Sequence, residues 1–115
     1  NYQLPIKEKV IQILKQVMIA EPERVYNSYP HQLSGGMQQR VMIGMAISTR
    51  PKIIIADEPT TALDVTTQKE ILELLKFLRK ELSMSIVLIT HNFGIICEYT
   101  DRVIVMYAGE IIEEG

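Results

Sequence analysis

Acidic side chains and an imidazole follow two short apolar runs in this chain of 115 residues. Asp57 and Glu58 come directly after residues 53–56, and His91 comes directly after residues 85–90. One carboxylate can hold a hydrated Mg²⁺ together with substrate phosphates, and the other can accept a proton from an attacking water. His91 can contact a phosphate or orient that water. In the alternative interpretation, the two acids are solvated residues that close a strand, and His91 is a satisfied histidine at the edge of the core.

A serine and two glycines precede a segment with helical character. Ser34 is a favoured helix N-cap, whereas Gly35 and Gly36 contribute no packing and cost backbone entropy. Free N–H groups and the helix dipole at such an N-terminus suit an anion that approaches the backbone closely. The alternative is an ordinary N-cap with a flexible approach, which leaves two successive residues without side chains unexplained.

Three apolar runs predict the strands that position these groups. Unbroken runs of this length are typical of strands buried on both faces, as in a parallel sheet, and ligands bind at the carboxyl ends of such strands. We expect the strands at 53–56, 85–90 and 102–106, with a turn at Ala108 and Gly109 leading into a fourth.

Helices are expected before and between the strands. Asp64 can cap one helix, and a short helix is expected over 93–99. Apolar spacing predicts earlier helices over 5–19 and 34–49, with a short helical turn and a loop over 20–31. The buried stripe of the helix capped by Asp64 comprises Ile71, Leu74, Leu75, Leu78 and Leu82. The alternation of strands and helices indicates an α/β fold with a parallel core. We therefore expect a helical unit at 1–50 and the α/β core at 51–115.

The composition is that of a globular domain and excludes several other classes. The chain is 47% hydrophobic and 23% charged, with a formal net charge of −2. No basic run suggests nucleic-acid binding. The single cysteine, Cys97, excludes an internal disulfide and suits a reducing cytosol. No apolar stretch approaches the ~20 residues that span a bilayer, and residues 1–5 do not resemble a signal peptide.

The order and spacing of these motifs resemble the ATPase domains of ABC transporters. The letters LSGGMQQR (33–40) resemble the signature motif, and IIIADEPT (53–60) resembles the Walker B strand with its catalytic glutamate. ALD (62–64) resembles the D-loop, and His91 falls at the position of the switch histidine. The phrases around these motifs resemble the ATP-binding subunits of bacterial and archaeal oligopeptide and dipeptide importers, in which Met37 commonly replaces the usual glutamine. Importers of nickel share much of this pattern.

The resemblance implies a P-loop NTPase-like parallel sheet core and assigns the signature residues to ATP. Ser34, Gly35 and Gly36 would bind the γ-phosphate of an ATP that the opposite protomer holds. Met37 and Gln38 would lie near that nucleotide. Phosphoryl transfer depends on such positioning and charge neutralisation more than on covalent chemistry.

The same resemblance gives roles to the acidic residues and the histidine. Asp57 would help to hold Mg²⁺ through water, and Glu58 would be the general base for the hydrolytic water. Asp64 would cross the dimer interface, and His91 would contact the γ-phosphate. The implied partners are a second ABC ATPase subunit, identical or paralogous, and transmembrane permease subunits. The implied location is the cytoplasmic face of the inner membrane of a bacterium or archaeon.

The phosphate loop that an ATP site requires is not found in these 115 residues. None of the six glycines is followed by Lys and then Ser or Thr, so the phosphate loop GxxxxGK[ST] is absent from the 115 residues. We therefore expect the second half of a nucleotide-binding domain, lacking the Walker A strand and inactive alone. In the family that strand lies between the strands at 85–90 and 102–106. Without it, we expect the gap to close by rearrangement, or the chain to self-associate through an exposed sheet edge.

Two other functional classes fit the motifs. A non-transport ABC ATPase would carry the same signature, and a coiled-coil insertion or a tandem second domain upstream would identify it. A non-catalytic interaction segment would keep the motifs without using ATP.

Overall fold

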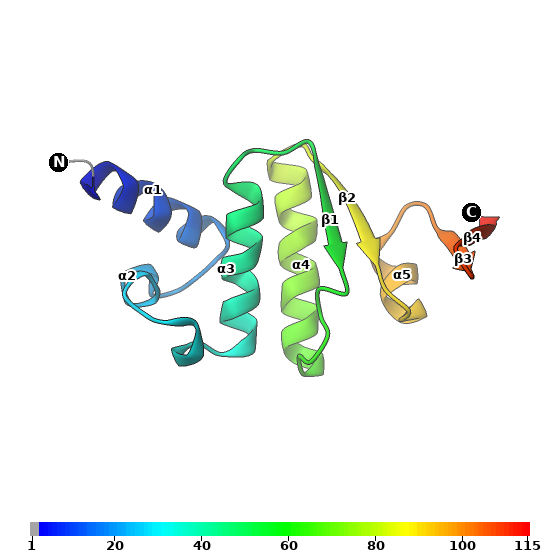
Figure 1. The fold of residues 1–115 in the computed structure, drawn as a ribbon, viewed down its shortest axis with the longest axis horizontal. Helices are drawn as coiled ribbons and strands as arrows, with labels where there is room; N and C mark the ends of the chain where they lie inside the picture. Colours follow the sequence, from blue (N-terminus) through cyan, green and yellow to red (C-terminus); the bar gives the residue numbers. More distant parts are fainter. Residues whose placement is uncertain (1–2) are drawn as a thin grey trace.

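Helices from the N-terminal half of the chain pack beside a two-stranded parallel sheet in the computed structural model, which describes residues 3–115. The molecule is elongated, with α1 and the β3–β4 hairpin at opposite ends (Figure 1). The elements in chain order are α1 (Gln3–Gln16), α2 (Pro22–Tyr26), the 3-10 helix η1 (Pro30–Gln32), α3 (Gly35–Ile47), β1 (Ile53–Asp57), α4 (Val65–Glu81), β2 (Ser85–Ile89), α5 (Phe93–Tyr99), β3 (Ile104–Tyr107) and β4 (Glu110–Glu114).

The predicted helices are confirmed, and side-chain caps define three of their starts. Ser34 caps α3, Asp64 caps α4, and the Asn92 carboxamide oxygen accepts from two N–H groups of α5. The first helix ends at Gln16, earlier than predicted, and Met18 just beyond it has a φ of 61°, in the left-handed region. Among residues 3–115, no helix is long and apolar enough to span a bilayer.

A single hydrophobic core joins the helices to one face of the sheet. β1 pairs parallel with β2, with Ile53 opposite Ser85 and Asp57 opposite Ile89. Ile54 of β1 is buried among core residues that include Ile71 and Leu78 of α4. The core contains residues from both sides of position 50, and the expected division into 1–50 and 51–115 stays a prediction.

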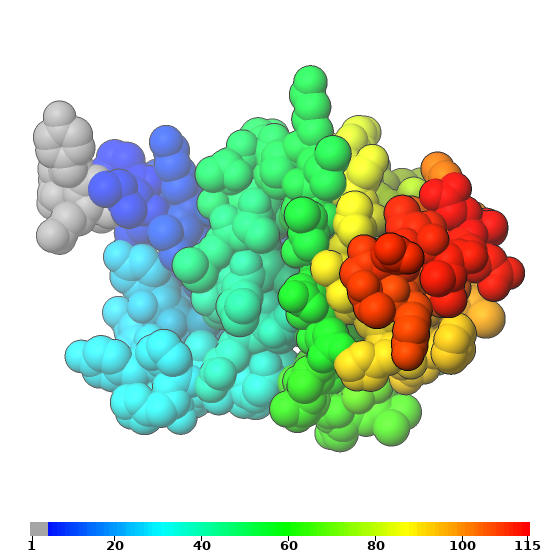
Figure 2. All heavy atoms as spheres, turned by 45° about the vertical axis from the view of Figure 1, so that its right-hand side comes forward, coloured from blue at the N-terminus to red at the C-terminus, as the bar shows by residue number. Residues whose placement is uncertain are grey.

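The expectation that β1 and β2 are buried on both faces is wrong. Ile53 and Ile55 are 60% and 68% exposed, and Val87 and Ile89 are about half exposed. Side chains alternate between the two faces of a strand, and only the face toward the helices is covered within the described chain. Figure 2 shows the green β1 and the yellow β2 side by side at the molecular surface.

The third strand is confirmed, but its place in the parallel sheet is wrong. β3 pairs with β4 in a separate antiparallel sheet. Ala108 and Gly109 form the predicted turn, and both have positive φ, at 50° and 82°. A two-residue turn of this kind matches the twist of the flanking strands and favours pairing with the nearest strand in sequence.

In the structure β2 and β3 lie in separate sheets and the gap between them stays open, which leaves self-association as the arm of the prediction to be tested. Self-association remains a prediction. We expect the purified 115-residue chain to scatter light as a species larger than 13.2 kDa, because apolar residues cover the open sheet face.

Charge on that face provides the matched control for self-association. A variant with Ile55→Lys and Val87→Lys is expected to be monomeric, since both side chains are exposed and a lysine there opposes pairing. A monomeric parent chain at all concentrations would contradict the prediction.

Candidate functional site

The carboxyl ends of the parallel strands bring two predicted site residues together. β1 ends at Asp57 and β2 ends at Ile89, and the Glu58 N–H donates to the Ile89 carbonyl oxygen at 2.8 Å. His91 Nδ1 lies 2.7 Å from Glu58 Oε1. The expected base and the expected histidine therefore lie in close contact at the sheet edge where α/β proteins bind ligands.

The backbone of Glu58 has an uncommon conformation, which hydrogen bonds with Thr61 support. Its φ is 47°, in the left-handed region that costs a non-glycine residue about 1–2 kcal/mol. The Glu58 carbonyl oxygen accepts from the Thr61 N–H at 3.2 Å, and Glu58 Oε2 accepts from Thr61 Oγ1 at 3.3 Å. Non-glycine residues in such conformations gather at functional sites, where the surrounding hydrogen bonds hold them in place.

The exposure of the pair argues against one of the two interpretations of His91. Its side chain is 88% exposed, so it is not a histidine satisfied at the edge of the core. The Glu58 side chain is 34% exposed. Its carboxylate is thus fixed by Thr61 and His91 and still reached by solvent, as a general base that takes a proton from water must be. The sequence prediction missed Thr61, whose signal is a hydroxyl three residues after Glu58.

Asp57 is exposed at the end of β1. Its carboxylate forms no ion pair or side-chain hydrogen bond with another of the described residues. No group of three His, Cys, Asp or Glu side chains in residues 3–115 is arranged to hold a metal. Mg²⁺ is usually bound by one or two carboxylates together with substrate phosphates and water, so a single free carboxylate fits this ion.

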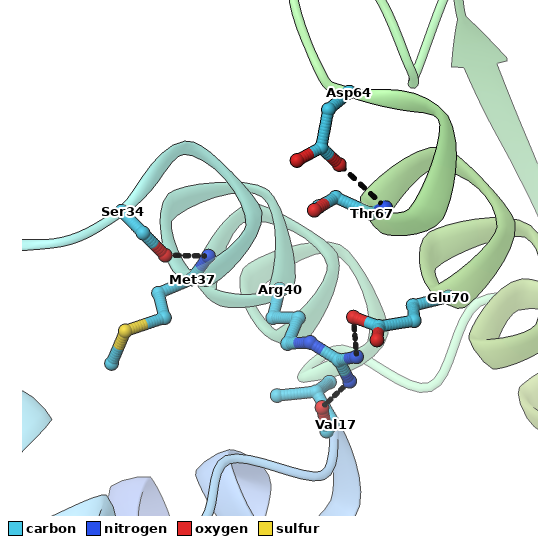
Figure 3. Close-up of polar contacts among 7 residues, drawn as sticks. All are labelled: Val17, Ser34, Met37, Arg40, Asp64, Thr67 and Glu70. Atoms are coloured by element: carbon cyan, nitrogen blue, oxygen red, sulfur yellow. Dashed lines mark hydrogen bonds and ion pairs between the residues drawn. The ribbon is translucent and has the colours of Figure 1, made fainter.

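The predicted anion-binding turn forms the start of α3. The Ser34 hydroxyl accepts from the Met37 N–H at 3.2 Å, as Figure 3 shows. The N–H groups of Gly35 and Gly36 precede the first intrahelical bonds, and within the described chain they donate to no other group. They are available to an anion at the positive end of the helix dipole.

The two residues after the glycines have mainly structural contacts. Met37 is half-buried against the core, and the Gln38 amide donates to the carbonyl oxygens of Pro30 and Leu33 at 2.7 and 3.1 Å. Gln38 therefore braces the loop that leads into α3. Its predicted place near a nucleotide stays a prediction.

Asp64 begins α4 close to this turn. Asp64 Oδ1 accepts from the Thr67 N–H at 2.7 Å, and the Thr67 hydroxyl and N–H, in that order, lower the pKa of Asp64 below its ordinary value. A Cβ built at Gly36 would lie 2.7 Å from Thr67 Cγ2. The start of α3 is thus in contact with the first turn of α4.

The predicted residues form two groups along one side of the molecule. Figure 1 shows the starts of α3 and α4 along its lower side, toward which the carboxyl ends of β1 and β2 also point. Glu58 and His91 make one group, and the turn at Ser34 with the helix start at Asp64 makes the other. Within the part of the chain that the structure describes, no hydrogen bond or ion pair joins the two groups.

Comparisons with known proteins agree with these motifs. The family model described as ABC transporter matches residues 2–61. The chain is 59% identical over 109 residues to the dipeptide transport ATP-binding protein DppD of Haemophilus influenzae, covering 95% of this chain and 33% of that protein. It is 59% identical over 103 residues to the glutathione import ATP-binding protein GsiA of Escherichia coli, covering 90% of this chain and 16% of that protein. The chain therefore spans about one third or less of these relatives.

Solved structures share the fold. The cbiO1 protein of Clostridium perfringens, part of the ABC transporter complex cbiONQ, matches with a TM-score of 0.84 and 35% identity. That match covers 98% of this chain and 44% of the other. The ATP-binding cassette MJ0796, in a dimeric post-hydrolysis state with ADP and Pi, matches with a TM-score of 0.77 and 39% identity, covering 94% of this chain and 45% of the other. The fold is accordingly that of a P-loop NTPase core, represented here in part.

Proposed function

The chain belongs to the ABC transporter family, and on this premise we propose that it forms part of the ATP-hydrolysing subunit of an importer. The subunit hydrolyses ATP and couples this reaction to solute uptake. The relatives named for dipeptide transport and glutathione import support an importer over a non-transport ATPase.

The contact between Glu58 and His91 carries the proposal. Glu58 accepts the proton of the attacking water, and Thr61 holds the second carboxylate oxygen in place. The exposed ring of His91 is in close contact with Glu58, and it is available to reach the γ-phosphate when ATP is bound. This pair orients a water and a phosphate, which is the main requirement of phosphoryl transfer.

Asp57 is the residue that would hold Mg²⁺, together with the phosphates of the nucleotide. Its support is an exposed carboxylate with no side-chain partner among the described residues. When bound, Mg²⁺ neutralises phosphate charge.

The turn at Ser34, Gly35 and Gly36 binds the γ-phosphate of the ATP held by a second ATPase subunit. Its support is the free N–H groups at the start of α3, which lies along the same side of the molecule as the carboxyl ends of β1 and β2. Asp64, which caps the helix that contacts this turn, would face the dimer interface. The dimeric state described for MJ0796 agrees with this arrangement.

The subunit works at the cytoplasmic face of the membrane beneath permease subunits, and its solute is a dipeptide or oligopeptide. The test is uptake in proteoliposomes that contain the full importer and ATP, with labelled dipeptide, glutathione and Ni²⁺ in separate assays. Dipeptide uptake that depends on ATP is the expected result. Uptake of glutathione or Ni²⁺ alone would replace the proposed solute, and ATP hydrolysis without uptake of any solute would contradict the importer function.

A further inference from the structure

Gly36 lies too close to α4 for any side chain. A Cβ at this position would be 2.7 Å from Thr67 Cγ2, whereas non-bonded carbon atoms rest about 3.5–4.0 Å apart. Beyond its chain neighbours and its own helix backbone, Thr67 Cγ2 is the one heavy atom of the described chain within 4 Å of that Cβ. At Gly35 the corresponding atom is Leu63 Cδ2, at 3.2 Å, which a small shift relieves.

Thr67 is held where it meets Gly36. Its N–H donates to Asp64 Oδ1 at 2.7 Å in the first turn of α4. A β-branched residue in a helix has few χ1 rotamers, so the methyl group has little freedom to rotate away from Gly36. The methyl group is thus a fixed surface against which the start of α3 rests.

A second contact joins the same two helices one turn further on. Arg40 Nη2 lies 3.8 Å from Glu70 Oε2, and Arg40 Nη1 donates to the Val17 carbonyl oxygen at 3.0 Å. Arg40 follows Gly36 by four positions, and Glu70 follows Thr67 by three, so both contacts lie on the same helix faces. Figure 3 shows Arg40 reaching Glu70 and Val17. The packing of α3 on α4 is therefore fixed at its first turn and at its second.

We infer that Thr67 is a positioning residue for the turn formed by Ser34, Gly35 and Gly36. Position 36 is a glycine because its backbone packs against the Thr67 methyl, which sets the place of the N–H groups in that turn. The effect on ATP turnover rests on the proposed function, whereas the packing contact does not. An alternative cause, close approach of a ligand to Gly36, makes a different prediction.

Removal of the methyl group tests the inference by rescue. In the chain made monomeric by Ile55→Lys and Val87→Lys, Gly36→Ala is expected to lower the folding equilibrium constant by about tenfold, as overpacking does. Thr67→Ser deletes Cγ2 and keeps the hydroxyl, so the double variant with Gly36→Ala and Thr67→Ser is expected to fold at least as well as the parent chain. Without the clash, alanine in place of glycine in a helix favours folding by about two- to fivefold.

The same variants are then placed in the full-length subunit, and ATP turnover is measured. Gly36→Ala is expected to lower turnover, and Thr67→Ser in the same subunit is expected to restore it. The matched control is Thr66→Ser. Thr66 is exposed and its methyl group is not near Gly36, so this substitution should restore neither folding nor turnover.

The outcomes separate the two causes and the two proposals. Restored folding and turnover in the double variant support the inference. Restored folding with turnover still lost shows that the ligand requires the bare backbone and overturns the positioning role, and folding that is not restored overturns the packing contact. A wild-type subunit that hydrolyses no ATP contradicts the proposed function, while urea unfolding of the chain still tests the packing.

Discussion

Replacement of Glu58 by Gln in the full-length subunit is expected to lower ATP turnover by about 10²- to 10⁴-fold, as loss of a general base does. Glutamine keeps the size of the side chain and can still accept from Thr61, but its amide cannot take a proton from water. ATP binding should persist, because the change leaves the phosphate-binding groups in place. Steady-state hydrolysis and calorimetric binding of ATP measure the two effects separately.

A second acidic residue controls for the effect of removing a charge. Glu81 lies at the exposed end of α4, and Glu81→Gln is expected to leave turnover unchanged. Turnover of Glu58→Gln near the parent value would remove Glu58 from its role as base. It would then favour the interpretation in which this residue only closes the strand.

Replacement of Ser34 by Asp is expected to lower ATP turnover by up to about 10³-fold. Asp caps a helix as well as Ser does, so α3 should form normally. The added charge would lie near the γ-phosphate, and two like charges ~4 Å apart repel by about 4 kcal/mol at an effective dielectric constant of about 20. The apparent affinity for ATP in the assembled dimer, measured beside turnover, should fall as well.

Asn at the same position is the matched control. It caps helices equally well and adds no charge, so Ser34→Asn should lose far less activity than Ser34→Asp. Equal losses in the two variants would assign the effect to the serine hydroxyl rather than to an anion. Equal, near-normal activities would show that no phosphate binds at this turn.

The sequence predicted those features that depend on neighbours along the chain. Asp64 caps α4 and Ala108 and Gly109 form the turn, because caps and turns are decided within three or four residues. The proximity of Glu58 and His91 could also be predicted from the sequence, since parallel strands place their carboxyl ends at one edge of the sheet.

Features that depend on which elements cover a surface were predicted less well. Ile55 and Val87 have the apolar character of doubly buried strand residues, but nothing in their own run indicates that one face of the sheet is open within this chain. β3 was assigned to the wrong sheet because its apolar run does not indicate which strand lies beside it, and the tight turn pairs it with β4.

Contacts between residues far apart in the sequence could not be predicted from any sequence pattern. Gly36 and Thr67 are 31 positions apart, and the glycine alone could equally indicate a ligand or a neighbour. The structure identifies a neighbour at van der Waals range, which the sequence could not distinguish from an approaching phosphate.

The central claim is that an ATP site combines Glu58 and His91 of one subunit with the turn at Ser34 of the other. The most direct measurement is the ATPase activity of dimers mixed from two inactive subunits, one with Ser34→Asp and one with Glu58→Gln. A mixed dimer has one site in which both contributing halves are unaltered, so we predict activity well above that of either variant alone. Mixed dimers as inactive as both parents, with dimer formation verified, would contradict the claim.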